Sequence, residues 1–296
     1  MQPPRQRREY RSATTDSRRW DAFVHRPGDI FICTPRKCGT TWMQTIVASL
    51  LWPAGDVPEA VTVISPWFDA RVEPVDDVVA RLESQTHRRF VKTHTPADGI
   101  PWFNSGRYVF MGRDGRDAFM SLCNHMEHLR ANVRGEIDAA AAADGLPGMP
   151  EWNGDIHAFF APWLAEGEMF DHVATYWERR DQANLLFVHH ADFKADLAGE
   201  MRRLADFLEI EVTEEQWPDV VERCRFDQMR RRGQEIGQFG WIFEGGARSF
   251  LFKGTNGRWR DVLTDDELSA YQQRVTKRLP RDAAAWLEHG RIALEA

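Results

Sequence analysis

One short stretch near the start of the chain combines the side chains that usually bind an anion. It reads Thr34-Pro35-Arg36-Lys37-Cys38-Gly39-Thr40-Thr41, with two adjacent cations, one glycine and several hydroxyls. An apolar run precedes it and a stretch with helical periodicity follows it, so we expect a turn between a strand and a helix. Backbone N–H groups in such a turn, with the partial positive charge of a helix N-terminus, suit an anion. The sequence therefore predicts a phosphate cradle.

The order of residues in this turn differs from that of ATP- and GTP-binding loops. A Walker loop reads Gly-x-x-x-x-Gly-Lys-[Ser/Thr], whereas Lys37 precedes Gly39 and no glycine fills the first position. We interpret the turn as a related cradle. Two alternatives stay open: an ordinary basic turn, and a nucleotide-dependent kinase, which would also need magnesium and an aspartate after a strand to hold it.

A second group of candidate residues follows another apolar run. His94 comes at the end of the run that begins at Phe90, and Pro96 keeps the residue before it out of helical space. Ligands collect beyond the carboxyl ends of strands in open parallel sheets, so Lys92 and His94 are expected near the cradle. An imidazole there suits proton transfer, although a lone histidine is more often structural.

Four apolar runs and the helices between them must position these groups. The strands are expected at residues 30–33, from 90, at 108–112 and at 184–190. One helix should bury a face formed by Trp42, Met43, Ile46, Val47, Leu50 and Leu51. Further helices are expected at 75–85, from about 115 with Asp114 as cap, from a cap at Asp192 to 208, at 214–224, and from 265 onward. This alternation, without a linker, predicts a single α/β domain with a central parallel sheet flanked by helices.

Composition narrows the class of protein. The 296 residues are 43% hydrophobic and 28% charged with a net charge of −7, which favours a globular protein and argues against a nucleic-acid partner. The cysteines Cys33, Cys38, Cys123 and Cys224 form no C-x-x-C pair, as expected in a reducing cytoplasm. No apolar run approaches the roughly twenty residues that span a bilayer, and no signal-peptide core is present. We expect a cytoplasmic protein without a membrane partner.

The cradle also resembles a family motif. Lys37-Cys38-Gly39-Thr40-Thr41-Trp42 resembles the 5′-phosphosulfate loop of the cytosolic sulfotransferases, usually Lys-Ser-Gly-Thr-Thr-Trp. Arg26-Pro27-Gly28-Asp29 is similar to that family's entry into its first strand, and the resemblance continues through most of the chain. It implies a P-loop NTPase-like sulfotransferase fold over residues 21–296. It also implies transfer of a sulfuryl group from 3′-phosphoadenosine 5′-phosphosulfate (PAPS) to a hydroxyl or amine, leaving the bisphosphate PAP.

The resemblance implies roles for individual residues. His94 matches the general base, and Lys37, helped by Lys92, would meet the charge on the leaving phosphate. Arg113 and Ser121, eight residues apart, match the pair that binds the 3′-phosphate. Donor binding is expected at Arg36, Lys37, Cys38, Gly39, Thr40, Thr41, Trp42, Arg113, Ser121, His190, Phe226, Phe252, Lys253 and Gly254. No metal is expected, because His125 and His128 form an H-x-x-H without further ligands nearby in sequence.

The chain departs from the family pattern at several of these positions. His190 and Cys224 stand where the family usually has tyrosine and threonine beside the adenine. Phe252 replaces the arginine before Lys253-Gly254, and the candidates to compensate are Arg225, Arg248 and Arg258. Cys38 replaces the loop serine. A thiol beside Lys37 is expected to lean toward thiolate and to be sensitive to oxidation, unless it is merely a small passive residue.

The acceptor is the least defined part of the prediction. Trp67 and Phe68 in a loop, and the aromatics between 152 and 177, suggest a small lipophilic or aromatic alcohol, phenol or amine, although core packing explains most of the second group. Residues 131–154 are expected to form a mobile loop over the acceptor side, and residues 1–20 a basic, flexible tail. The family's dimer motif is not found before Phe250, so monomer and homodimer stay open, as does a catalytically idle nucleotide-binding module.

Overall fold

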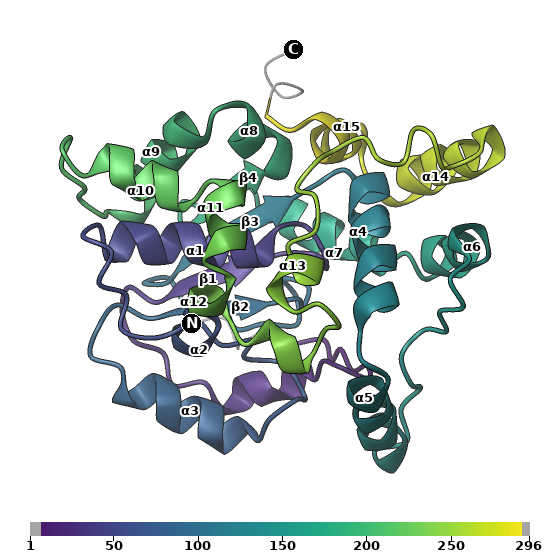
Figure 1. Ribbon diagram of the computed structural model, residues 1–296, viewed down its shortest axis with the longest axis horizontal. Coiled ribbons are helices and arrows are strands. Elements are labelled where there is room, and N and C mark those ends of the chain that lie inside the picture. The colour runs from purple at the N-terminus through teal and green to yellow at the C-terminus, as the bar shows by residue number, and fades with distance from the viewer. Residues whose placement is uncertain (1–6, 292–296) are drawn as a thin grey trace.

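Four parallel strands form the centre of the molecule, as the sequence predicts. The computed structural model describes residues 7–291. The strand order is β2-β1-β3-β4, with β1 Ile30–Cys33, β2 Phe90–Thr93, β3 Arg107–Gly112 and β4 Leu185–His189. Every pairing is parallel, and Cys33 lies opposite both Thr93 and Phe110. The carboxyl ends of β1, β2 and β3 therefore meet at one edge of the sheet (Figure 1).

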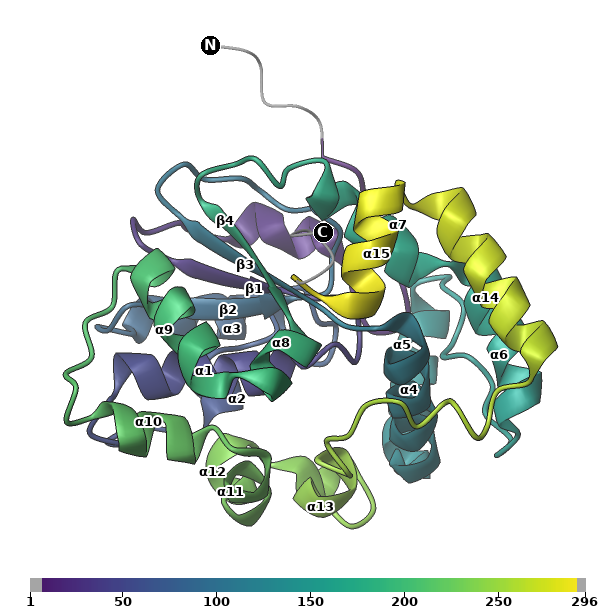
Figure 2. The ribbon, with the colours of Figure 1, turned by 90° about the horizontal axis from the view of Figure 1, so that it is seen from above.

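The two faces of the sheet belong to two separate cores. Ile30 and Ile32 pack with α1 and α9, whereas Phe31 and Cys33 face the core that contains η1 and α7. All four side chains are fully buried. Figure 2 shows the sheet between these two layers of helices. Because both faces are covered, β1 is apolar at every position instead of alternating with polar residues, and the polar residues of the other strands lie at or near their ends.

The helical elements, given in chain order, surround this sheet. They are η1 Ser17–Ala22, α1 Thr40–Leu51, α2 Val61–Ile64, α3 Val75–Ser84, α4 Gly115–His128, α5 Ala131–Ala143, α6 Ile156–Glu166, α7 Glu168–Trp177, α8 His190–Ala195, α9 Leu197–Leu208, α10 Trp217–Arg223, α11 Phe226–Arg231, α12 Gly233–Ile236, η2 Phe239–Trp241, α13 Ala247–Phe250, α14 Asp265–Arg278 and α15 Arg281–His289. Asp114 accepts a hydrogen bond from the Arg116 amide at the start of α4, as predicted.

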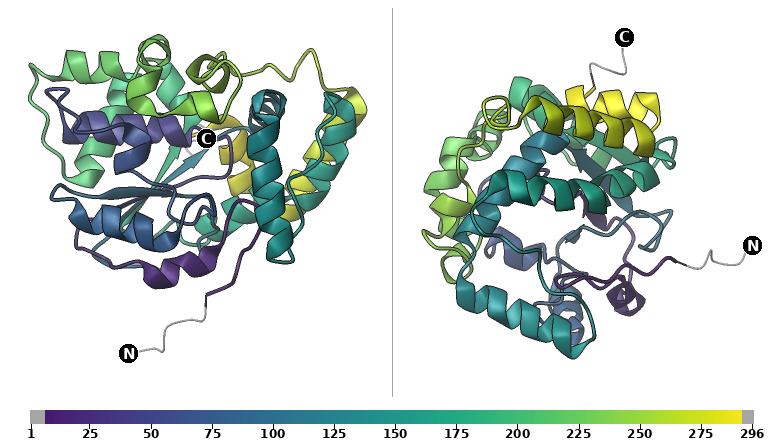
Figure 3. Two further views of the ribbon diagram at one scale, coloured as in Figure 1. Left: turned by 60° about the horizontal axis from the view of Figure 1, so that its bottom comes forward. Right: turned by 90° about the vertical axis from the view of Figure 1, so that its right-hand side faces the viewer.

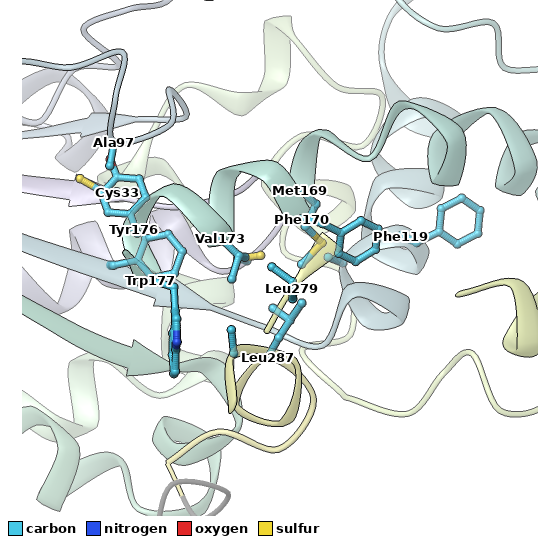
Figure 4. Packing of buried hydrophobic residues seen from close by; sticks show 14 of the residues in the cluster. Cys33, Ala97, Phe119, Met169, Phe170, Val173, Tyr176, Trp177, Leu279 and Leu287 are labelled. Carbon is cyan, nitrogen blue, oxygen red and sulfur yellow. The ribbon is translucent and has the colours of Figure 1, made fainter. Parts of the chain in front are cut away.

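Helix α7 accounts for much of the aromatic density that follows residue 152. Phe170, Val173 and Tyr176 are at most 1% exposed. Figure 4 shows Tyr176 beside Cys33 of the sheet, and the leucines of the C-terminal helices beneath α7. These aromatics are therefore core residues, which confirms the simpler interpretation of their abundance.

The segment expected to be a mobile loop is partly a helix. Residues 131–143 form α5, which lies beyond the end of α4 at the periphery of the molecule (Figures 1 and 3). The expectation is therefore wrong for this half of the segment. Five consecutive alanines from Ala139 onward supply high helix propensity, and Arg134 pairs with Asp138 four residues later.

The helix expected after the last strand is divided into two. Helix α8 begins at His190, directly after β4, and His189 accepts the capping hydrogen bond from Ala191. Helix α9 then begins after Asp196, which accepts from the Gly199 amide. The cap is therefore Asp196 and not Asp192, because the chain turns after Ala195 and leaves a new helix N-terminus to be satisfied.

The N-terminal segment also differs from the expected tail. Residues 1–6 lie outside the described part of the chain. Of the rest, Thr14, Thr15 and Ser17 are less than 9% exposed, and Trp20 packs against Phe68. Thr15 forms an antiparallel bridge with Ala70. The arginines suggested a solvated segment, but the residues between them supply enough buried surface to dock residues 13–20 onto the domain.

Candidate active site

The cradle between β1 and α1 adopts a conformation that depends on glycine. Gly39 has a φ of 102° and forms the N-cap of α1. A Cβ atom at this position would lie 2.9 Å from Met111 Cε and 3.2 Å from His190 Cδ2. Lys37 also has a positive φ, 67°. The loop therefore presents the start of α1 toward one point and lies directly against β3 and α8.

His94 lies next to the cradle with its ring orientation fixed. Its Nδ1 is 2.8 Å from the Thr34 carbonyl oxygen, to which it donates. The Thr34 hydroxyl is 3.2 Å from the same nitrogen and 2.6 Å from the Thr40 hydroxyl. This arrangement leaves Nε2 as the unprotonated nitrogen. Burial, then the charges of Lys92 and Arg36, hold the pKa of His94 well below 6.5, so the ring is neutral at neutral pH.

Several cations are enclosed together around the cradle. Burial and the neighbouring Arg113 and Lys92 lower the pKa of Lys37 to about 7. Burial lowers the pKa of Lys92 to about 8; Asp69 opposes this shift, and Arg36 adds a smaller lowering effect. The Arg113 guanidinium is enclosed as well, and its Nε has no hydrogen-bond partner among the described residues. Like charges gathered in this way suit a polyanionic ligand.

Arg113 connects the cradle to the C-terminal loop. Its guanidinium donates to the Lys37 carbonyl at 3.3 Å, to the Thr255 carbonyl at 3.3 Å and to Asn256 Oδ1 at 3.1 Å. Ser121 lies two turns along α4 and is half-buried. Asp117, between them in sequence, accepts from the Gly257 amide at 2.8 Å. The structure therefore brings Lys37, Arg113 and the loop at residues 254–258 together.

A second set of predicted residues gathers beside α1. The Trp42 indole N–H donates to the Cys224 carbonyl at 2.8 Å, and its ring meets that of His190 edge-on at 5.1 Å. His190 is buried, and its Nδ1 has no partner among the described residues. Phe226 lies against Gly254, where a Cβ would approach the phenyl ring to 2.6 Å. An aromatic surface and an orphaned polar atom suit a flat heterocycle.

The segment from Phe252 to Arg258 is more exposed to solvent than the cradle. Lys253 is exposed, and its ammonium lies 5.2 Å from the centre of the Phe252 ring. Arg258 packs on the same ring at 5.0 Å. Its charge also contributes to lowering the pKa of Arg113, after the larger effect of burial. Arg225, by contrast, is paired with Glu222 at 2.9 Å, and Arg248 is exposed on α13.

Arg36 points toward the N-terminal segment. Its guanidinium donates to Thr14 Oγ1 at 2.7 Å and Thr15 Oγ1 at 3.0 Å, and lies 3.7 Å from a Glu168 carboxylate oxygen. The central carbon of the Arg36 guanidinium lies 5.6 Å from the centre of the Trp67 ring. The Trp67 ring in turn meets the His94 ring edge-on, with 4.9 Å between the ring centres. A contact between Arg36 and the donor stays a prediction.

Cys38 does not have the properties of a reactive thiol. It is fully buried, and burial raises the pKa of its thiol to about 12 despite Arg113 and Lys37 nearby. The expectation of a thiolate is therefore wrong, because enclosure outweighs the neighbouring positive charges.

Two residues of the site were missed in the sequence. Thr34 fixes both His94 and Thr40, and the signal for it was a hydroxyl directly after the first strand. His125 Nδ1 lies 3.3 Å from the Lys37 ammonium, although the sequence suggested it only as half of an unlikely metal pair. Its place on α4, one turn after Ser121, was the available signal.

Two partly open pockets lie outside the cradle. One, of about 240 Å³, is between α1 and α12, and one, of about 120 Å³, is bordered by Asp117 and Asn256. Lys37 and His94 line neither of these pockets. The candidate active site is therefore identified from contacts between residues and not from a pocket. None of the helices within residues 7–291 combines the length and the apolar character that a bilayer span requires.

The curated relatives of this chain include sulfotransferases. The chain is 34% identical to a glycolipid sulfotransferase of Mycobacterium bovis over 95% of this chain and 94% of that protein. It is 26% identical to human sulfotransferase 1C2 over 82% of this chain and 80% of that protein.

Solved structures share the fold. Retinol dehydratase in complex with androsterone and PAP superposes with a TM-score of 0.68 at 22% identity, over 90% of this chain and 87% of that chain. Mouse sulfotransferase SULT7A1 complexed with PAP gives 0.67 at 18% identity, over 94% and 92%. The model of the sulfotransferase domain matches residues 27–282, and the chain therefore belongs to the sulfotransferase family.

Proposed function

We propose that this protein transfers the sulfuryl group of PAPS to a hydroxyl or amine of a small acceptor, with His94 as general base. The observation that carries the proposal is the placement of a neutral, oriented imidazole beside enclosed cations at one edge of the sheet. Neutral His94 can take a proton, and Lys37 and Lys92 can meet negative charge.

The residues present fit the donor. The buried cations around Lys37, the orphaned Arg113 Nε and the orphaned His190 Nδ1 all require polar or anionic partners. Bound PAPS would supply an electrophilic sulfur and a phosphate leaving group. Lys37 and the amides of residues 38–41 would hold the 5′ end. Arg113 and Ser121 would hold the 3′-phosphate, and Trp42 and Phe226 would enclose the adenine.

The proton and the developing charge are handled by different residues. As the acceptor oxygen or nitrogen bonds to sulfur, its proton passes to His94 Nε2, because Nδ1 is committed to the Thr34 carbonyl. The bond from sulfur to the 5′-phosphate oxygen breaks, and the electron pair stays on that oxygen. The ammonium groups of Lys37 and Lys92 stabilise this charge without a change of position for the loop.

Arg258 is the proposed replacement for the arginine that the family has at the position of Phe252. Its guanidinium packs on the Phe252 ring and lies close enough to Arg113 to affect the pKa of that residue. Arg225 is engaged with Glu222, and Arg248 is exposed on α13. A planar guanidinium from residue 258 would therefore reach the same phosphate from another direction.

The acceptor, the cellular location and the oligomeric state are proposed only as broad classes. A free alcohol, phenol or amine is one class of acceptor. The glycolipid sulfotransferases among the relatives add a second candidate, a hydroxyl group on a glycolipid. The four cysteines are free thiols, which suits the cytoplasmic location that we propose. Monomer and homodimer both remain compatible with the chain.

One experiment separates the proposal from its alternatives. Thermal unfolding is measured with PAP and with magnesium-ATP, and transfer of labelled sulfate from PAPS is measured against a panel of alcohols, phenols, amines and glycolipids. We expect stabilisation by PAP and a labelled product. Stabilisation by magnesium-ATP alone would support the kinase. Binding of PAP without a product from any acceptor would support the idle module.

A further inference from the structure

The Lys37 ammonium already has a partner inside the protein. Among the described residues, its hydrogen-bond partner is His125 Nδ1, at 3.3 Å. An ammonium group has no acceptor, so Lys37 donates and the imidazole accepts. The proton of the neutral ring is then on Nε2. The other close neighbour is the Phe250 ring, 5.0 Å from the ammonium, which attracts a cation but offers no lone pair.

His125 is held in place by its surroundings. It lies on α4, one turn after Ser121, and its ring meets Phe243 edge-on at 4.8 Å. Phe243 in turn packs against Phe250. Burial and the charges of Lys37, Arg36 and Lys92 hold the pKa of His125 well below 6.5. The ring therefore stays neutral and keeps its acceptor at Nδ1.

We propose that His125 is a positioning residue for sulfuryl transfer: by accepting a hydrogen bond at Nδ1, it keeps the Lys37 ammonium charged and inside the site. This inference rests on the proposed function, in which Lys37 stabilises the leaving phosphate. Without an acceptor at residue 125, Lys37 would keep the repulsion of Arg113 and Lys92 and lose its described hydrogen-bond acceptor. It would then release its proton or turn away from the site.

Two amide substitutions distinguish this role from simple packing. In His125→Asn, the side-chain oxygen can occupy the place of Nδ1, whereas in His125→Gln it reaches the place of Nε2. We expect turnover of H125N within about threefold of the wild type and turnover of H125Q about tenfold lower, the usual cost of a lost hydrogen bond to a charged group. The acceptor KM should change little in either variant.

The matched control is His128 on the same helix. Its Nδ1 bonds to the Asn124 carbonyl within α4, and we expect His128→Gln to retain wild-type turnover. The dependence on Lys37 is tested in a double variant. H125Q should add no further loss to K37A if the histidine acts through the lysine. Equal losses in H125N and H125Q, or losses that multiply with K37A, would overturn the proposal.

A direct measurement on Lys37 separates this inference from the proposed function. The rate at which acetic anhydride labels Lys37 is followed by mass spectrometry in PAP-free protein. The labelling is done at pH 6, below the Lys37 pKa of about 7, where most of the amine is protonated. Because only the neutral amine reacts, H125Q should label at least about threefold faster than the wild type and H125N. Equal rates in all three proteins would contradict the positioning role. A complete absence of sulfate transfer by the wild type would contradict the proposed function alone.

Discussion

The two halves of the site are built in different ways. The strand-end half comprises Thr34–Trp42 and Lys92–His94, and the closing half comprises Arg225–Phe226 and Phe252–Arg258. In the first, Thr34 and His94 are at most 9% exposed, and their bonds arise at the ends of paired strands. In the second, Lys253 is exposed, and Arg113 reaches the loop through bonds of 3.1 and 3.3 Å.

This difference corresponds to a division of roles between catalysis and donor binding. A general base and a charged group next to the leaving atom require fixed geometry, which the sheet supplies. A nucleotide phosphate can be held by side chains that adapt, because charge attraction tolerates small changes of direction. We therefore expect loss of the base in the strand-end half to reduce turnover, changes in the closing half to reduce donor affinity, and changes in the charge of the strand-end lysines, which contact the donor as well, to affect affinity.

The largest effect is expected at the base. His94→Ala should lower turnover by roughly 10² to 10⁴, because His125, another neutral imidazole beside the cradle, already accepts a hydrogen bond from Lys37. Affinity for PAP, measured by calorimetry, should stay within about threefold of the wild type. The exposed His157 provides the control, and His157→Ala should leave both quantities unchanged. Near-normal turnover in H94A would remove the base assignment.

Alkaline pH should weaken donor binding without any substitution. In the free protein the pKa of Lys37 is about 7 and that of Lys92 about 8, and a bound polyanion raises both. Binding above these values therefore takes up protons, so affinity is highest at low pH and falls as pH rises. We expect about a tenfold loss of PAP affinity from pH 7.5 to pH 9, where the phosphates are already ionised.

Calorimetry in buffers with different ionisation enthalpies would measure this proton uptake directly. Lys37→Gln should show a shallower pH dependence than the wild type, since one of the two titrating groups is gone. An affinity that rises toward pH 9 would show that these lysines do not pair with the ligand's phosphates.

A smaller effect is expected in the closing half. Arg258→Ala should weaken PAP binding about fivefold, as expected for one partly exposed charged contact, and should leave turnover at saturating donor within about twofold. Arg248→Ala, at an exposed position on α13, is the matched control and should bind normally. The opposite order of the two variants would assign the compensating charge to residue 248.

The smallest effect is expected at Cys38. Because its thiol is fully buried with a pKa raised to about 12, the residue should act as a small filler. Cys38→Ser should change turnover and PAP affinity by less than about twofold, and both proteins should respond equally to brief peroxide treatment. Loss of activity on oxidation in the wild type alone would restore a redox role.

The sequence was most informative where local pattern and tertiary structure agree. The parallel sheet, the cradle before Thr40 and the cap at Asp114 follow from apolar runs, turn chemistry and capping, all of which act over a few residues. The contact between Lys37 and His125 joins residues 88 positions apart, and the place of His125 one turn after Ser121 indicates the site but not the partner. The helix at residues 131–143 cannot be predicted from apolar periodicity, because its alanines favour a helix without forming an apolar face.

The docked N-terminal segment has a practical consequence for anyone who shortens this protein. Thr14 and Thr15 supply the hydroxyls that hold the Arg36 guanidinium, and Thr15 also bridges to Ala70 beside the loop of Trp67. A truncation at residue 17 that is meant to trim an arginine-rich leader would also release a cradle side chain. In crystallisation or kinetics, a protein shortened in this way would differ from the chain of residues 1–296 at Arg36 as well as at its N-terminus.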